Sequence, residues 1–166
     1  GEIYNFLELR KYLEKRGHKF KSKTDTEVIL HLYEEKGRDC LEDLNGMFAF
    51  ALWDKNKKLL FLARDRLGIK PLYYSYTNGS LMFSSEIKAL LQIENAKREI
   101  DLGALDQYLT FLWVPDPKTI FKGIYKLPPG HCLTYKDKEI LVREYWDLRF
   151  IEKDYTEKEW IDKILN

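Results

Sequence analysis

The chain has 166 residues, of which 45% are apolar, so it can fold around a packed core. Its 28 basic and 27 acidic residues leave a formal charge of +1, which argues against nucleic-acid binding by phosphate neutralisation. Lys19, Lys21 and Lys23 are close in sequence, but a solvated strand edge accounts for them. No apolar run is long enough to span a bilayer, so we expect no membrane segment.

Asn5 is a candidate cap of a first helix, which Gly17 ends. A short strand is expected over residues 18–22. Thr24 and Glu27 then have the spacing of a capping box, which predicts the start of a second helix.

After residue 46 the apolar period changes from helical to extended. We expect one hairpin with strands over 47–53 and 58–63 around the polar turn 54–57, and a second with strands over 71–76 and 80–84 around Asn78-Gly79. The continuous apolar run in the first of these strands predicts burial on both faces.

The second half of the chain mixes helical and extended patterns. Ser85 is a candidate cap of a helix that runs to residue 91, and residues 94–98 form a polar linker. A second helix is expected over residues 102–113. Strands are expected over 119–125 and 131–135, around the turn Pro128-Pro129-Gly130. Thr156 and Glu159 form a capping box for a last helix. Because this helix reaches Asn166 after about three turns, we expect the chain to be cut from a longer protein at both ends.

The cysteines and histidines form no recognisable motif. Two cysteines cannot staple a domain of this size, and no CxxC pair is present, which favours a reducing, cytoplasmic setting. Cys40 and Cys132 lie in apolar surroundings and are expected to be buried structural thiols. His18, His31 and His131 lack partners at a suitable spacing, so we expect neither ligands nor bases among them, and no metal.

Five strings in the same order resemble the class II glutamine amidotransferases, and the asparagine synthetases among them. They are GEIYN at residues 1–5, TDTEVIL at 24–30, LNGMFAF at 44–50, ARDRLGIKPLYY at 63–74 and FSSEIKAL at 83–90. A looser likeness continues through residues 119–130, where LPPG is typical of the asparagine synthetases.

The resemblance implies an α+β fold of the Ntn type, a four-layer sandwich in which helices flank two stacked antiparallel sheets. We expect this sandwich to be incomplete and to be followed by the start of a helical synthetase domain. Residues 1–93 would be the rear part of the amidotransferase type-2 domain, and 94–150 its linker and returning strands. Residues 151–166 would be the first helix of the asparagine synthetase domain.

The resemblance also implies a reaction. Glutamine is hydrolysed to glutamate and ammonia, and the ammonia passes to ATP-activated aspartate. In the family the nucleophile is an N-terminal cysteine, which this chain lacks, so we expect no catalytic residue here and no activity of the chain alone. ATP and magnesium belong to the parent enzyme, because no SGGxDS loop occurs in this sequence.

Three residues match positions of the family's glutamine pocket. Gly1 and Glu2 match the end of an Asn-Gly-Glu segment, which makes Gly1 a candidate oxyanion donor and Glu2 a carboxylate near the substrate amine. Asp25 matches the aspartate that binds the α-ammonium of glutamine. From the residues alone, Glu2 is an ordinary exposed strand residue, and Asp25 equally well complements the helix dipole.

Charged residues follow the strand that ends at Ala63. Arg64, Asp65 and Arg66 could bind an anion, but an ion-paired network that fixes the turn is the favoured interpretation, with Gly68 at an unusual backbone angle.

Two rival functions stay open at this stage. One is a class II amidotransferase with another acceptor, and the other is a non-catalytic binding or scaffold domain. If the gene encodes neither a Cys-Gly start upstream of Gly1 nor an SGGxDS loop downstream of Asn166, the scaffold is the favoured interpretation. The oligomeric state is not readable, with a homodimer among the options.

Overall fold

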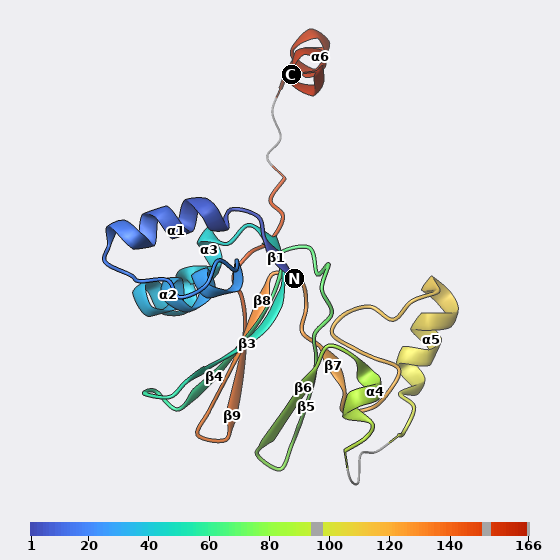
Figure 1. Cartoon of the computed structure of the whole chain (residues 1–166). Coiled ribbons are helices and arrows are strands. Elements are labelled where there is room, and N and C mark those ends of the chain that lie inside the picture. The colour runs from blue at the N-terminus through green and yellow to red at the C-terminus, as the bar shows by residue number, and fades with distance from the viewer. Residues whose placement is uncertain (94–97, 151–153, 166) are drawn as a thin grey trace.

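A computed structural model of the chain describes residues 1–93, 98–150 and 154–165. Its strands form two larger antiparallel sheets and one short ribbon (Figure 1). The first sheet has the order β3-β4-β8-β9, the second has the order β6-β5-β7, and the ribbon pairs β1 with β2. The strands are β1 Glu2–Ile3, β2 Gly46–Met47, β3 Ala49–Asp54, β4 Leu59–Arg64, β5 Tyr73–Thr77, β6 Ser80–Ser84, β7 Tyr125–Lys126, β8 His131–Lys136 and β9 Glu139–Glu144.

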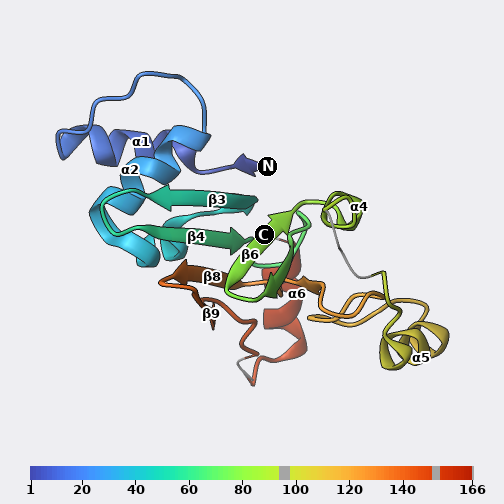
Figure 2. The same ribbon diagram turned by 90° about the horizontal axis from the view of Figure 1, so that it is seen from below.

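The helices lie outside the two sheets, so the layers run helix, sheet, sheet, helix (Figure 1), and Figure 2 shows α1 and α2 beside β3, with α4 and α5 at the opposite end of the molecule. Helices α1 to α3 lie beside the first sheet, α4 and α5 lie on the side of the second, and α6 stands apart (Figure 1). Their bounds are α1 Phe6–Lys15, α2 Thr26–Lys36, α3 Cys40–Asp43, α4 Ile87–Leu90, α5 Leu102–Phe111 and α6 Glu157–Leu165. This arrangement confirms the expected α+β class. Within the described residues, no helix has both the length and the apolar character that crossing a membrane requires.

Strand β4 lies at the centre of the core because its side chains alternate between two packed layers. Phe61 and Ala63 are fully buried in a cluster with residues of α1, α2 and α3. Leu62 belongs to a second cluster, which joins the two sheets. Strand β3 lies at a sheet edge, and its Trp53 is 57% exposed, so the expected burial on both faces is wrong for residues 47–53.

The hairpins with short turns were correctly predicted. Strands β3 and β4 flank the turn 55–58, where Asp54 Oδ1 accepts the backbone N–H groups of Asn56 and Lys57. Strands β5 and β6 flank Asn78-Gly79, whose φ angles of 52° and 75° suit a tight hairpin. A third hairpin, β8–β9, was missed because its turn residues, Asp137 and Lys138, carry only a weak turn signal.

Residues 18–22 form no strand, and Thr24 and Glu27 form no capping box. The Glu27 carboxylate instead accepts the backbone N–H groups of Lys21 and Ser22, each at 2.7 Å, and the Ser22 hydroxyl. These N–H groups are bound to a carboxylate, so they are not available for pairing with a strand.

Residues 119–125 do not form one strand, and no hairpin surrounds the Pro-Pro-Gly turn. Apart from an isolated bridge between Phe121 and Ile100, only β7 is extended there, and it pairs with β5, whereas β8 pairs with β4 and β9. The buried Thr119 hydroxyl donates to the Ile124 carbonyl at 2.8 Å and holds a local loop. Pro128 and Pro129 lack a backbone N–H, so the chain crosses between the sheets at this point.

The remaining predicted elements differ in outcome. Helix α4 begins two residues after Ser85, and the Ser84 hydroxyl accepts the Glu86 N–H at 3.1 Å. The capping box of α6 is confirmed, because Glu159 Oε2 accepts the Thr156 N–H at 2.8 Å. The linker predicted over 94–98 lies outside the described residues except for Arg98, and so does the start, at 151–153, of the last predicted segment.

Asp65, which directly follows β4, is 1% exposed. Its carboxylate accepts the backbone N–H groups of Phe48 at 3.2 Å, Ile69 at 2.9 Å and Lys70 at 2.9 Å. Its own carbonyl accepts the N–H of Gly130 at 2.9 Å. The Asp65 carboxylate therefore satisfies backbone N–H groups at the start of β3 and in the loop toward β5, and the Asp65 carbonyl binds the segment just before β8.

Arg64 complements Asp65 by donating to backbone carbonyls. Its guanidinium binds the carbonyls of Gly68, Lys70 and Leu127 at 2.7–2.8 Å, and its own carbonyl accepts the Tyr145 hydroxyl. The expected structural role of the charged triplet is thus supported, but it works mainly through backbone groups. Gly68 has a φ of 66°, the unusual angle expected there.

We expect Asp65→Asn to lower the free energy of unfolding by about 2–4 kcal/mol, because an amide cannot accept all three N–H groups. Urea unfolding measures this change. Asp137→Asn is the matched control, because Asp137 is 82% exposed at a positive φ that asparagine tolerates. Equal stability of Asp65→Asn and the wild type would contradict the role given to this carboxylate.

Candidate functional site

Gly1 and Glu2, two of the three residues predicted to bind glutamine, lie at the start of the ribbon β1–β2. Glu2 pairs with Met47, and Ile3 pairs with Gly46. A Cβ atom on Gly46 would lie 2.2 Å from the Glu2 carbonyl oxygen, and one on Gly1 would lie 2.7 Å from the Met47 carbonyl oxygen. Glycine is therefore required at both positions for the backbones to approach, while the Glu2 side chain stays exposed.

Asp25 lies at the N-terminus of α2 and joins that helix to the ribbon. Its Oδ2 atom accepts the backbone N–H of Ile3 at 2.8 Å, and Ile3 itself is buried. The carboxylate makes no capping hydrogen bond to α2. In the described part of the chain, Oδ1 has only a 3.4 Å contact with the Thr26 hydroxyl. The structure thus brings Asp25 next to the segment of Gly1 and Glu2, with one carboxylate oxygen weakly engaged.

Asn5 holds the other end of this ribbon. It was predicted to cap α1, but its side chain makes no capping bond. Its amide instead donates to the Asp43 carbonyl at 2.8 Å and accepts the Asn45 N–H at 3.0 Å. The Tyr4 N–H also donates to the Asn45 carbonyl at 2.7 Å. These bonds fix β1 against the segment that enters β2.

Glu27 fixes the loop that leads into Asp25. The N–H group of Lys21 is the largest cause that lowers the Glu27 pKa to about 2, and the Ser22 hydroxyl adds to it. This carboxylate is therefore ionised at neutral pH, and it orders the backbone just ahead of α2. The acidic side chains of Glu2 and Asp25 give the site the negative charge that suits the ammonium group of a zwitterion, whereas the N-terminus of α2 attracts anions.

Neither cysteine is built as a nucleophile. Both are free and buried, as predicted. Burial raises the pKa of the Cys40 thiol to about 12, with Asp43 adding to the shift. Burial also raises the pKa of the Cys132 thiol. A thiol reacts as its thiolate, and burial disfavours that form in both side chains.

Two histidines do have partners, contrary to the sequence analysis. His18 Nδ1 lies 3.1 Å from His31 Nδ1, and His31 Nδ1 lies 3.0 Å from Glu34 Oε2. The spacing of His31 and Glu34 on one helix face was a usable signal, but His18 precedes them by a loop. His131 lies elsewhere, with its Nδ1 at 2.7 Å from the Pro129 carbonyl.

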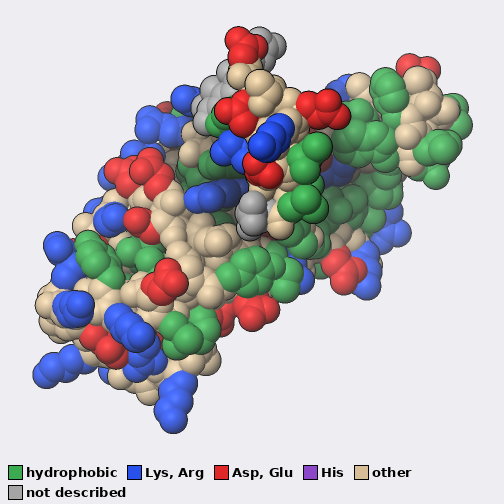
Figure 3. Space-filling view, turned by 90° about the horizontal axis from the view of Figure 1, so that it is seen from above, with side chains coloured by type: hydrophobic (Ala, Val, Ile, Leu, Met, Phe, Trp, Pro, Cys, Tyr) green, Lys and Arg blue, Asp and Glu red, His purple; other side chains and the backbone are tan. Residues whose placement is uncertain are grey.

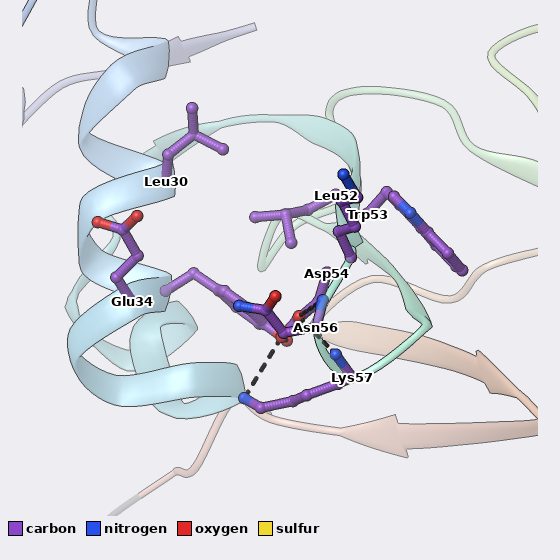
Figure 4. A pocket seen from close by; sticks show the side chains of 9 residues that line it. Leu30, Glu34, Leu52, Trp53, Asp54, Asn56 and Lys57 are labelled. Atoms are coloured by element: carbon purple, nitrogen blue, oxygen red, sulfur yellow. Dashed lines mark hydrogen bonds and ion pairs between the residues drawn. The ribbon is translucent and has the colours of Figure 1, made fainter.

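A hollow of about 410 Å³ lies between α2 and the β3–β4 turn (Figure 4). Its only acidic lining residues are Glu34 and Asp54, and Gly1, Glu2 and Asp25 are not part of it. Asp54 is already bound by the Tyr33 hydroxyl at 3.1 Å and by the turn N–H groups. Because its carboxylate holds the turn, this hollow does not qualify as the amino-acid site.

Charges of both signs lie side by side on the face seen in Figure 3, in agreement with the balanced composition. Apolar side chains gather at the end of the molecule that carries α5 (Figure 3). Those from α5 and the turn after it are Leu102, Tyr108, Leu109, Phe111, Leu112 and Trp113. This surface is separate from the Asp25 site, which lies beside α2 (Figure 1).

Comparison with known proteins identifies relatives along most of the chain. The family model described as a glutamine amidotransferase domain matches residues 1–146. The chain is 45% identical to glutamine-hydrolysing asparagine synthetase 3 of Bacillus subtilis over 149 residues, which are 89% of this chain and 24% of that protein. It is 42% identical to glutamine-hydrolysing asparagine synthetase 1 of the same organism over 169 residues, 99% of this chain and 27% of that protein. The chain therefore spans about a quarter of the length of these relatives.

Among solved structures, a similar fold occurs in the glutamine phosphoribosylpyrophosphate amidotransferase of Bacillus subtilis. The TM-score is 0.61 at 19% identity, and the match covers 87% of this chain and 28% of that one. At this identity the likeness concerns the fold alone, and it agrees with the expected Ntn-type architecture.

We expect both thiols to be unreactive in the native chain, because they are buried as thiols. A chromogenic disulfide reagent should label neither in the folded protein and both after unfolding in urea. Ala51→Cys on the exposed edge strand β3 is the positive control and should react at once. Rapid labelling of Cys40 or Cys132 in the native chain would contradict the buried, protonated state.

Proposed function

The chain belongs to the glutamine amidotransferase domain family, and from this premise we propose that it is the glutaminase part of a glutamine-hydrolysing asparagine synthetase. The two asparagine synthetases at 45% and 42% identity support this choice of parent enzyme. In that reaction glutamine gives glutamate and ammonia, and the ammonia is passed to ATP-activated aspartate.

The proposal divides the chain as the resemblance implies. Residues 1–93 and 94–150 belong to the amidotransferase domain, and residues 151–166 begin the synthetase domain. ATP, magnesium and aspartate are substrates and cofactor of the longer protein. The sequence holds no SGGxDS loop, so we assign no contact with them to this chain. The free, unpaired state of the two cysteines supports a reducing, cytoplasmic setting.

Asp25 has the central role in the proposed glutamine site. Its carboxylate binds the α-ammonium, Glu2 supplies a second negative charge near that amine, and the Gly1 N–H is a donor for the oxyanion. One observation carries this assignment. The Asp25 carboxylate turns away from its own helix and accepts the N–H of Ile3, which places it beside Gly1 and Glu2.

The thiols of this chain take no part in the proposed chemistry. Amide hydrolysis through an acyl-enzyme needs an accessible thiolate, and the buried Cys40 and Cys132 do not provide one. We therefore assign the nucleophile to the longer protein, and to neither of these residues.

We expect Asp25→Asn to weaken glutamine binding about 10- to 100-fold, because a charge-assisted hydrogen bond to the ammonium is lost. Calorimetric titration of the folded chain with glutamine measures this, with Asp106→Asn on the exposed surface of α5 as the matched control. Ammonia release, assayed in parallel, should be absent for every variant.

Two outcomes would contradict this assignment. Equal glutamine affinity of Asp25→Asn and Asp106→Asn would remove Asp25 from the site. Ammonia release by the isolated chain would show that Cys40 or Cys132 acts as the nucleophile. In the longer protein, Asp25→Asn should raise the KM for glutamine and leave synthesis with added ammonia unchanged, because added ammonia bypasses the glutaminase. A scaffold domain would show neither effect.

A further inference from the structure

Three potential metal ligands converge at the outer side of α2. His18 Nδ1 comes from the loop after α1, while His31 Nδ1 and Glu34 Oε2 come from α2 itself. The distances are 3.1 Å between the two nitrogens, 3.0 Å from His31 to Glu34 and 3.5 Å from His18 to Glu34. The histidine side chains are only 14% and 17% exposed, whereas Glu34 is 64% exposed.

A carboxylate lies near the outer nitrogen of each imidazole. His18 Nε2 lies 2.9 Å from Glu35 Oε1, and His31 Nε2 lies 3.6 Å from Glu27 Oε1. A carboxylate beside Nε2 favours a proton on that nitrogen. A metal ion that takes both Nδ1 atoms leaves the proton of each imidazole on Nε2, on the side of these carboxylates.

The two imidazole nitrogens and the carboxylate oxygen lie only 3.0–3.5 Å apart, which is the separation of ligands around one bound cation. The surroundings are acidic as well, since Glu27 and Glu35 flank the imidazoles and Arg16 is the cation bound to Glu35, at 2.6 Å. We propose that His18, His31 and Glu34 bind a divalent transition-metal ion of the zinc type.

The ligand set and its spacing fit this class of ion. Imidazole nitrogens suit zinc, cobalt and nickel, whereas magnesium and calcium prefer sites made of oxygen. For bonds of about 2.0–2.1 Å, tetrahedral ligands lie about 3.3 Å apart, close to the three distances observed here. The exposed position of Glu34 leaves the fourth position to water. Figure 4 shows its carboxylate on α2, directed away from the β3–β4 turn.

Further contacts hold the imidazole rings in place, so the ligands are already positioned without a bound ion. The Phe20 ring packs edge-on against His31 with centroids 4.5 Å apart, and Arg10 lies 4.6 Å from the centre of the Phe20 ring. Glu27 is itself fixed by the Lys21 and Ser22 N–H groups. A carboxylate that orients a ligating histidine through its other nitrogen is the usual second layer of a zinc site.

The test is a zinc titration of the tag-free, chelator-treated chain at mildly alkaline pH, in competition with a chromophoric chelator. We expect one ion per chain, a rise in Tm with zinc, and visible d–d absorption when cobalt replaces zinc. His31→Gln and Glu34→Gln should each weaken zinc binding at least about 10-fold and reduce the rise in Tm. Glu34 is exposed, so its variant tests the site without loss of the fold.

His131→Gln is the matched control, because it removes a histidine that lies outside the cluster. This variant should bind zinc as the wild type does. Two results would overturn the proposal. Zinc affinity that is the same in the wild type and in His31→Gln would indicate scattered surface binding. An absence of zinc binding at millimolar concentration would mean that the imidazoles share a proton only.

Discussion

The fold depends on one buried carboxylate, which accepts backbone N–H groups at the place where segments of the two sheets meet. Strands β3, β4 and β8 and the loop toward β5 meet where β4 ends, and their N–H groups would be buried without partners there. The Asp65 carboxylate accepts three of these N–H groups, and its carbonyl accepts the N–H of Gly130. Arg64 satisfies the carbonyls of the same region. The side chains of Arg64 and Asp65 therefore supply the hydrogen bonds to backbone groups that strand pairing does not supply in this region.

The same constraint positions the candidate glutamine site. Phe48, whose N–H is bound by Asp65, directly follows β2, and β2 carries β1 through the close pairing of Gly46 with Ile3. The Ile3 N–H then holds Asp25. A continuous series of backbone contacts thus runs from the core to the carboxylate that would receive the substrate amine. A half-buried acidic side chain gains a defined position from it, which an isolated helix N-terminus could not provide.

Local features were predictable from the sequence, and features that depend on distant partners were not. The turn after Asp54 and the Asn78-Gly79 turn determine their hairpins within a few residues. Residues 119–125 have an extended pattern, but the partner of β7 is β5, about 50 residues earlier, and no periodicity reports that. Asp25 is a candidate only through its family match, since its residue type suits a helix cap equally well. His18 escaped notice because a loop separates it from His31.

The loop between α1 and α2 connects the cluster of His18, His31 and Glu34 to the candidate glutamine site at Asp25. It begins near His18 and ends at Asp25, and Glu27 binds its backbone N–H groups from within. Asp25 anchors its end to β1, while the histidine cluster anchors its start to α2. An ion at His18, His31 and Glu34 would form three bonds, and so tie the start of the loop to the helix that Asp25 begins. Among the residues that the structure describes, the loop pairs with no strand. Contacts of side chains at both of its ends, a hydrogen bond at Asp25 and the histidine cluster at the start, are therefore the means by which this chain can hold Asp25 in place.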